Sequence, residues 1–174
     1  MTVLLCGLIL FITIHLIKPL LPRLRGGIIN RIGEAPYKIV FSILSAIGLL
    51  AIIFGYKQSP HEWLWAPLFG AGVTMLLMLP ATALVVAAYF PNSWGRHVKH
   101  PMLIGALIWA GAHLATQSHL KGIMLFGGFF LFAVIVLCKA DWHRSVSPKP
   151  LWLNVAWLLA SKLAYIGIRY VHIH

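Results

Sequence analysis

Long apolar runs separated by short polar gaps make up most of the chain. Six such runs cover residues 2–21, 39–56, 66–90, 101–115, 122–138 and 151–168. A helix that crosses a bilayer needs about 20 predominantly apolar residues. The fourth run is short, and the sixth contains Asn154 and Lys162. We therefore expect an all-α fold, a polytopic membrane helix bundle of about six transmembrane helices in one domain of residues 1–174. Five spans are the alternative.

The composition excludes most soluble classes of protein. Hydrophobic residues make up 60% of the 174 residues, charged residues 10%, and the mean hydropathy is +0.89. Soluble domains contain about 45–50% apolar and about 25% charged residues. Cys6 and Cys138 fall inside or at the edge of apolar runs, so a disulfide framework is excluded as well. The expected partner is the lipid bilayer.

The basic residues concentrate in alternate gaps between the apolar runs. Lys and Arg number 14 against three acids, which gives a net charge of +11. The first, third and fifth gaps, with the end of the run before the first of them, hold Lys18, Arg23, Arg25, Arg31, Lys38, Arg96, Lys99, Lys139, Arg144 and Lys149. The other gaps and the tail hold Lys57, Lys121 and Arg169. Because basic loops stay in the cytoplasm, this pattern predicts six spans with both termini periplasmic. It does not predict nucleic-acid binding, since the charges form no single amphipathic face.

Acidic side chains are too scattered for catalysis by paired carboxylates. Glu34 and Asp141 lie in predicted cytoplasmic loops, and Glu62 lies on the other side. No carboxylate lies within a span, so the usual acidic relay of a transporter is missing.

Histidine is therefore the candidate for chemistry inside the membrane. Loops, span ends and the tail hold His61, His97, His119, His143, His172 and His174, where we expect solvated imidazoles. His100 begins the fourth span, and His15 and His113 lie inside spans. Ionisable groups at that depth are costly, so they usually face the protein interior and have a function. A hydrogen bond to a neighbouring helix is the alternative explanation.

Both intramembrane histidines share a four-residue pattern with an aromatic and a small residue. The two series are Gly7, Phe11, His15 and Gly105, Trp109, His113. A flat tetrapyrrole needs an imidazole for iron, a ring for stacking and a glycine for clearance. Ordinary helix packing gives the same pattern. Imidazole also binds zinc or copper, but the bundle offers no third or fourth zinc ligand, which favours haem.

The depths of the two histidines complicate their pairing. His15 lies about six residues, or roughly 9 Å, from the cytoplasmic end of its span, whereas His113 lies roughly 18 Å beyond Pro101. His15 and His113 are our predicted axial ligands, and His100 or another histidine is the alternative. Arg96 or Lys99 would pair with the propionates.

Three segments carry a family resemblance. They are KHPMLIGALIWAGAHLATQSHLKGIMLFGGFFLFAV at 99–134, RIGEAPYKIVFSILSAIGLLAIIFGY at 31–56, and a first span that ends in Ile-His-Leu. The chain resembles the NnrU family of bacterial membrane proteins, which implies the bacterial inner membrane and a role in denitrification and nitric oxide metabolism. That family is similar to the 15-cis-zeta-carotene isomerase, an integral membrane haem b protein.

The resemblance implies that His113 and His15 match iron-ligating histidines. The isomerase also has a cysteine three residues before its matching histidine, whereas this chain has Ala110. We expect a haem b membrane protein acting as a redox or nitric-oxide-responsive component with a redox partner. One alternative is a haem-dependent cis–trans isomerase of a hydrophobic polyene or isoprenoid. Another is a small transporter or structural membrane subunit.

Overall fold

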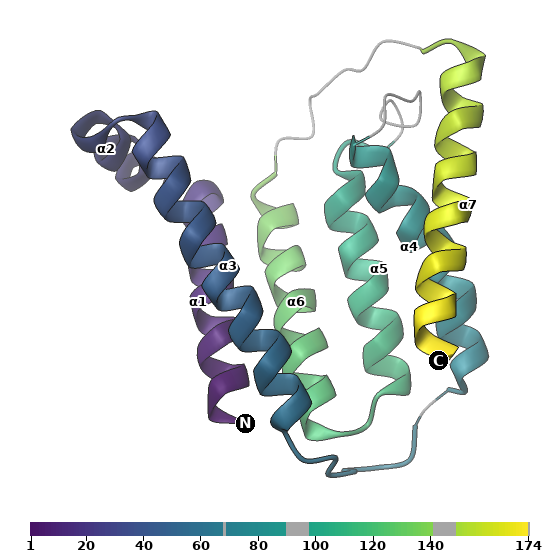
Figure 1. The fold of residues 1–174 in the computed structure, drawn as a ribbon. Coiled ribbons are helices and arrows are strands. Elements are labelled where there is room, and N and C mark those ends of the chain that lie inside the picture. The colour runs from purple at the N-terminus through teal and green to yellow at the C-terminus, as the bar shows by residue number, and fades with distance from the viewer. Residues whose placement is uncertain (68, 90–97, 141–148, 174) are drawn as a thin grey trace. The chain divides into compact units, whose positions relative to one another are not determined.

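The described part of the chain is helical, as the apolar runs predict. The computed structural model describes residues 1–67, 69–89, 98–140 and 149–173. The helices are α1 (Thr2–Leu20), α2 (Pro22–Ile32), α3 (Glu34–Gln58), α4 (Ala71–Tyr89), α5 (Pro101–Thr116), α6 (Leu120–Cys138) and α7 (Leu151–Ile173) (Figure 1). The expectation of an all-α fold is confirmed.

Five of these helices are long and apolar enough to cross a membrane. They are α1, α3, α4, α6 and the segment Leu151–Tyr170 of α7, and α5 is a shorter apolar helix of 16 residues. Large apolar side chains such as Ile9, Ile43 and Leu163 are exposed. Such a surface is unfavourable in water and matches hydrocarbon. The polytopic membrane bundle with about six apolar helices is therefore confirmed.

The helices form two compact units. The first unit comprises Met1–Ala66 and Ser118–Lys139, with helices α1, α2, α3 and α6. The second unit comprises Pro67–Gln117 and Ala140–His174, with helices α4, α5 and α7. Each unit therefore joins segments that are far apart in the sequence.

In the first unit, α1 and α3 pack at glycines. A Cβ atom on Gly7 would lie 2.7 Å from the Ile52 amide nitrogen and 2.9 Å from the Ala51 Cβ atom. A Cβ atom on Gly55 would collide with the backbone of Leu4. Small residues let helix backbones approach closely, which is how helices associate in lipid.

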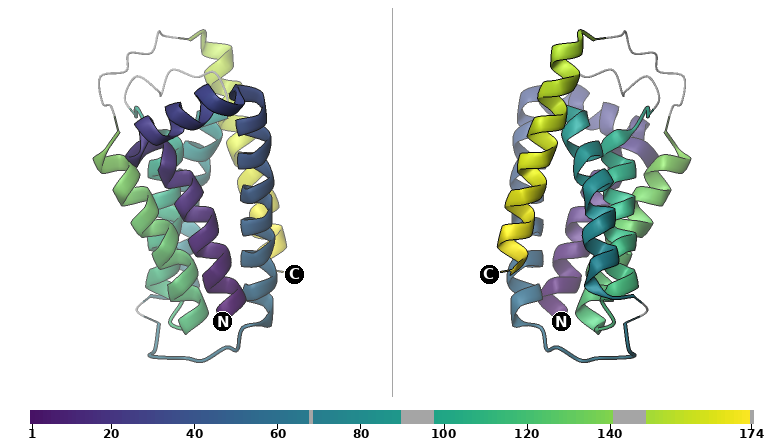
Figure 2. Two further views of the ribbon diagram at one scale, coloured as in Figure 1. Left: turned by 90° about the vertical axis from the view of Figure 1, so that its left-hand side faces the viewer. Right: turned by 90° about the vertical axis from the view of Figure 1, so that its right-hand side faces the viewer.

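The short helix α2 occupies a stretch that we expected to be a basic loop. Pro22 stands at its N-terminus, where a missing N–H costs nothing, and Gly33 ends it with a φ of 88°. Its apolar residues Leu24, Ile28 and Ile32 recur every four positions. Figure 2 shows α2 turned across the ends of α1 and α3. The run is too short and too polar to stand out as a span.

In the second unit, α5 and α7 both pack on α4. A Cβ atom on Gly105 would lie 2.8 Å from the Ala81 carbonyl oxygen, so α5 and α4 are in close contact. The indole N–H of Trp157 donates a hydrogen bond to the Ala83 carbonyl oxygen at 3.0 Å. α7 is thereby bonded to the backbone of α4.

Three predicted spans begin at other residues in the structure, α6 by two residues and α3 and α4 by five. α3 begins at Glu34 rather than at residue 39, because the turn at Gly33 lets a helix begin at once and Lys38 pairs with Glu34 at 2.9 Å. α4 begins at Ala71 rather than at residue 66, after Pro67 and Gly70. An apolar run therefore does not mark the first residue of a helix when polar or turn-forming residues lie at that end.

The Gly7 contact predicts a large effect of a single side chain. We expect Gly7→Val to destabilise the protein by about 1–3 kcal/mol, because two methyl groups would enter the α1–α3 contact. Unfolding in detergent, followed by circular dichroism, measures this effect. The matched control is Gly127→Val on α6, where an added Cβ atom meets nothing within 4 Å. Equal losses of stability in both variants would contradict the glycine contact.

Candidate functional site

His113 lies near the C-terminal end of α5 and is only 5% exposed. Its Nδ1 atom lies 2.8 Å from the carbonyl oxygen of Trp109, one turn earlier on the same helix. A carbonyl oxygen can only accept, so Nδ1 carries the proton and donates it. In the neutral imidazole the lone pair is then on Nε2, which is the nitrogen that ligates a metal in this tautomer.

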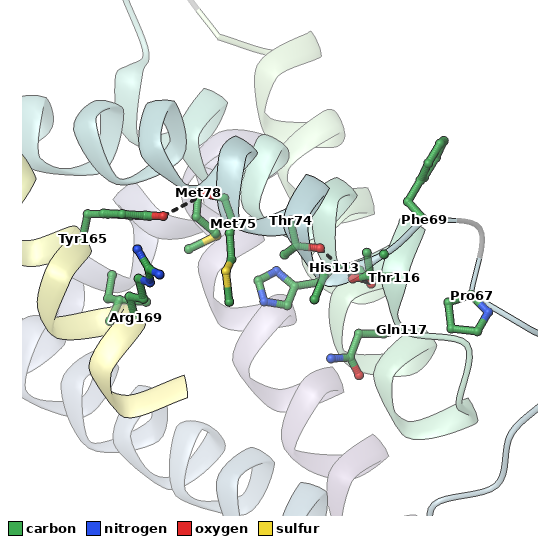
Figure 3. Close-up of a pocket in the computed structure, with 13 residues that line it drawn as sticks. Pro67, Phe69, Thr74, Met75, Met78, His113, Thr116, Gln117, Tyr165 and Arg169 are labelled. Carbon is green, nitrogen blue, oxygen red and sulfur yellow. Dashed lines mark hydrogen bonds between the residues drawn. The ribbon is translucent and has the colours of Figure 1, made fainter. Parts of the chain in front are cut away.

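A cavity of about 370 Å³ adjoins this imidazole. Its lining includes Met75 and Met78 from α4, His113 from α5, and Tyr165 and Arg169 from α7. Figure 3 shows the imidazole of His113 with Met75 beside it, and Arg169 and Tyr165 extending from α7. The volume falls within the range of about 300–1,000 Å³ that is typical of ligand pockets.

Threonine hydrogen bonds join the walls of this cavity. The Thr74 hydroxyl of α4 donates to the Thr116 hydroxyl of α5 at 2.8 Å, and the Thr116 hydroxyl lies 3.2 Å from the Ala112 carbonyl oxygen. On the other wall, the Tyr165 hydroxyl donates to the Met75 carbonyl oxygen at 3.2 Å. These bonds satisfy polar groups in an apolar setting and fix the spacing of the three helices.

His15 has the same local arrangement in the first unit. Its Nδ1 atom lies 2.7 Å from the Phe11 carbonyl oxygen on α1, so Nδ1 is again the donor. The Phe11 ring stacks on the imidazole at 4.1 Å between ring centroids, and the Phe41 ring meets its edge at 5.1 Å. Among the residues that the structure describes, Nε2 of His15 has no hydrogen-bond partner.

The other predicted site residues have different surroundings. The Trp109 ring lies 5.5 Å from the His113 ring, so it adjoins the imidazole as expected of a flanking residue. At Gly105 the space of the missing Cβ atom is taken by α4, which gives this glycine a role in helix packing. Clearance for a cofactor at Gly105 stays a prediction.

His100 and Arg96 stand at the other end of α5. His100 is the residue before the first turn of α5, as expected. His113 lies thirteen positions further along the chain, which is roughly 20 Å along a helix. These two histidines of one helix could not ligate the same iron. Arg96 lies outside the described residues.

The expectation that His119 is a solvated imidazole is wrong. His119 is 3% exposed and precedes the first turn of α6. Its burial follows from backbone pairing with the segment around Trp63, because the Leu64 amide donates to the Ser118 carbonyl oxygen at 2.8 Å. Lys121, which we assigned to a loop, is also buried and belongs to α6.

Sequence reasoning singled out His113 and missed the rest of the cavity lining, including Met75, Met78, Tyr165 and Arg169. Met75 and Met78 are three residues apart and Tyr165 and Arg169 four apart, so each pair shares one helix face. That spacing was the available signal. It is weak, because methionine in an apolar span fits a lipid-facing surface equally well.

The sequence matches a known protein family. The model of the NnrU protein family matches residues 3–174. The chain belongs to the NnrU family. No curated protein and no solved structure matches it. In this NnrU member, Ala110 is fully buried one turn before His113, and the free cysteines Cys6 and Cys138 both belong to the first unit.

The α4–α7 wall of the cavity gives a second prediction. We expect Tyr165→Phe to lower the free energy of unfolding by about 1 kcal/mol, because it removes only the hydroxyl that bonds to Met75. Reversible unfolding in detergent measures the loss. Tyr37→Phe is the control, since no hydrogen bond of the Tyr37 hydroxyl is present in the described part of the chain. An unchanged free energy of unfolding in Tyr165→Phe would contradict the hydrogen bond between Tyr165 and Met75.

Proposed function

We propose that this NnrU protein binds haem b through intramembrane histidine and acts in denitrification and nitric oxide metabolism in the bacterial inner membrane. One observation carries the proposal. The buried imidazole of His113, with Nδ1 held by the Trp109 carbonyl, adjoins a cavity between three apolar helices. Haem-ligating histidines commonly have this arrangement, because the donated Nδ1 proton orients the ring and fixes its tautomer.

The side chains that line the cavity include groups that can bind haem iron and haem propionates. Iron in haem accepts imidazole nitrogen and thioether sulfur, and the lining offers His113 together with Met75 and Met78. The Arg169 guanidinium in the same lining is complementary to the carboxylates of haem propionates. Acidic side chains, which would repel propionates, are absent from the described lining.

A second residue that would hold the iron is proposed from the sequence pattern. His15 is our proposed partner of His113, because it is the other intramembrane histidine and its Nδ1 is held in the same way. The thioethers of Met75 and Met78 are the competing ligands, since they line the same cavity as His113. Phe11 and Trp109 are proposed to flank the ring, and Arg96 or Lys99 to pair with propionates.

When bound, haem supplies one-electron chemistry and an iron that binds nitric oxide. The chain's own contribution is to orient the imidazole through the Trp109 carbonyl and to surround the site with apolar side chains that exclude water. Arg169 adds one positive charge beside the cavity, which favours anionic groups there. The isomerase alternative lacks comparable support, because a buried alanine, Ala110, stands where the relative has its cysteine.

The absorption spectrum tests haem binding. The protein purified from haem-supplemented cells is expected to show a Soret band, and His113→Ala is expected to lose most of it. His15→Ala is expected to change the spectrum if His15 is the second ligand, whereas Met75→Leu or Met78→Leu changes it if a thioether is. His61→Gln is the matched histidine control. A folded protein without a Soret band would overturn the proposal.

We also propose that both termini are periplasmic, because the basic residues concentrate in alternate gaps. Labelling of single cysteines in intact cells tests this in a variant with Cys6→Ser and Cys138→Ser. A membrane-impermeant maleimide is expected to label Lys57→Cys in intact cells and Lys149→Cys only after disruption. The reverse result would invert the orientation.

A further inference from the structure

A cluster of polar residues lies where α3 ends and α6 begins in the first unit. We call it the Lys121 cluster, and it comprises Tyr56, His61, Ser118, His119 and Lys121. The imidazole rings of His61 and His119 are 4.5 Å apart between centroids, and the Tyr56 ring lies 6.4 Å from the His119 ring. The Lys121 Nζ atom lies 4.9 Å from the centre of the Tyr56 ring. The side chains of Tyr56, His61, His119 and Lys121 therefore form one contiguous group, and Ser118 precedes His119 in the chain.

Lys121 is 4% exposed, which is unusual for a lysine. Its Nζ atom donates one hydrogen bond, to the Ser59 carbonyl oxygen at 3.1 Å, at the C-terminal end of α3. An ammonium group has three N–H donors. The Ser59 carbonyl and the Tyr56 ring satisfy this cation in part, and no carboxylate pairs with it in the described part of the chain.

Two further polar atoms of the cluster are buried without a partner. They are the hydroxyl oxygen of Ser118, a residue 1% exposed, and the Nδ1 atom of His119. Each is an orphan that costs free energy unless something else bonds to it. Both belong to the residues just before α6, three and two positions before Lys121.

The titratable side chains with nitrogen atoms in the Lys121 cluster are all basic. α6 has no acidic residue in its first turn, and the N-terminal end of a helix carries a partial positive charge. Desolvation and the nearby Lys121 and His119 lower the pKa of His61 below its usual value, so positive charge is already disfavoured there. Glu62, which directly follows His61 in the chain, is exposed and forms no ion pair with Lys121.

Backbone bonds hold the cluster in place. The Leu64 amide donates to the Ser118 carbonyl oxygen at 2.8 Å, and the Leu120 amide donates to the Glu62 carbonyl oxygen at 3.2 Å. The Trp63 ring lies 5.6 Å from the His119 ring. The segment around Trp63 therefore pairs with the start of α6, which orders the cluster in advance of any ligand.

We propose that the Lys121 cluster is a binding site for a small oxyanion. Such a ligand accepts the remaining N–H groups of Lys121, the Ser118 hydroxyl, and an Nδ1 proton of His119. It also neutralises a buried positive charge, which a water molecule cannot do. A metal ion would need several His, Cys, Asp or Glu ligands together, and the described residues contain no group of three. In the proposed orientation the cluster lies at the periplasmic ends of α3 and α6.

This site is distinct from the proposed haem site, since the Lys121 cluster shares no residue with the His113 cavity and includes neither Phe11 nor His15. The two proposals can therefore fail separately. Nitrite, nitrate and phosphate share the required chemistry, and they differ in size, shape and charge. Affinities for the three identify which oxyanion the cluster accepts.

Titration calorimetry of the purified protein in detergent tests the site with sodium nitrite, nitrate and phosphate as probes, in a background of a bulky organic salt. At least one probe is expected to bind saturably. Lys121→Met is expected to weaken that binding about tenfold or more, because a charge-assisted hydrogen bond is lost. Lys121→Arg keeps the charge and is expected to retain most of the binding. Lys57→Met, an exposed lysine of α3, is the matched control.

A second variant keeps the test decisive if Lys121→Met fails to fold. Ser118→Ala removes one hydroxyl and is expected to weaken binding several-fold. Haem content, read on the same samples, is expected to be unchanged in both variants. Absence of saturable binding for all three anions, or equal affinities in Lys121→Met, Ser118→Ala and the unchanged protein, would overturn the proposal.

Discussion

Close packing of helix backbones at small residues is the contact on which both units depend. In lipid, an apolar side chain gains little free energy when it moves from contact with lipid tails to contact with another helix. Helices therefore associate through tight van der Waals contact. Gly7 and Gly55 allow that contact between α1 and α3, and Gly105 allows it between α5 and α4. Because α5 lies so close to α4, Thr74 reaches Thr116, and the cavity beside His113 has a fixed wall.

A second feature recurs in both units, the hydrogen bond from a histidine to its own helix. His15 and His113 each donate Nδ1–H to the carbonyl oxygen four residues earlier. The helix itself thus supplies the acceptor that fixes the tautomer, and no partner helix is needed for that nitrogen. An imidazole held in this way presents Nε2 in a defined direction, which is the state that a metal-ligating histidine requires.

The apolar runs were sufficient to predict the spans, because length and hydrophobicity alone decide whether a helix can cross a bilayer. They could not reveal α2, which is short and polar. His113 could be predicted as a buried histidine from its place inside a run. The burial of His119 and Lys121 could not, because it results from pairing with a segment more than fifty residues earlier. Met75, Met78 and Arg169 were missed because only tertiary packing gathers them around His113.

The central claim is that the imidazole of His113 is an iron ligand in the α4–α5–α7 cavity. Imidazole rescue of His113→Gly tests it most directly, because free imidazole can replace a deleted ligand in a cavity of this size. The account predicts a weak or absent Soret band in His113→Gly and recovery of the band when imidazole is added. An amine too large to enter the cavity is expected to restore no band. A His113→Gly protein that keeps its full haem spectrum without imidazole would contradict the account.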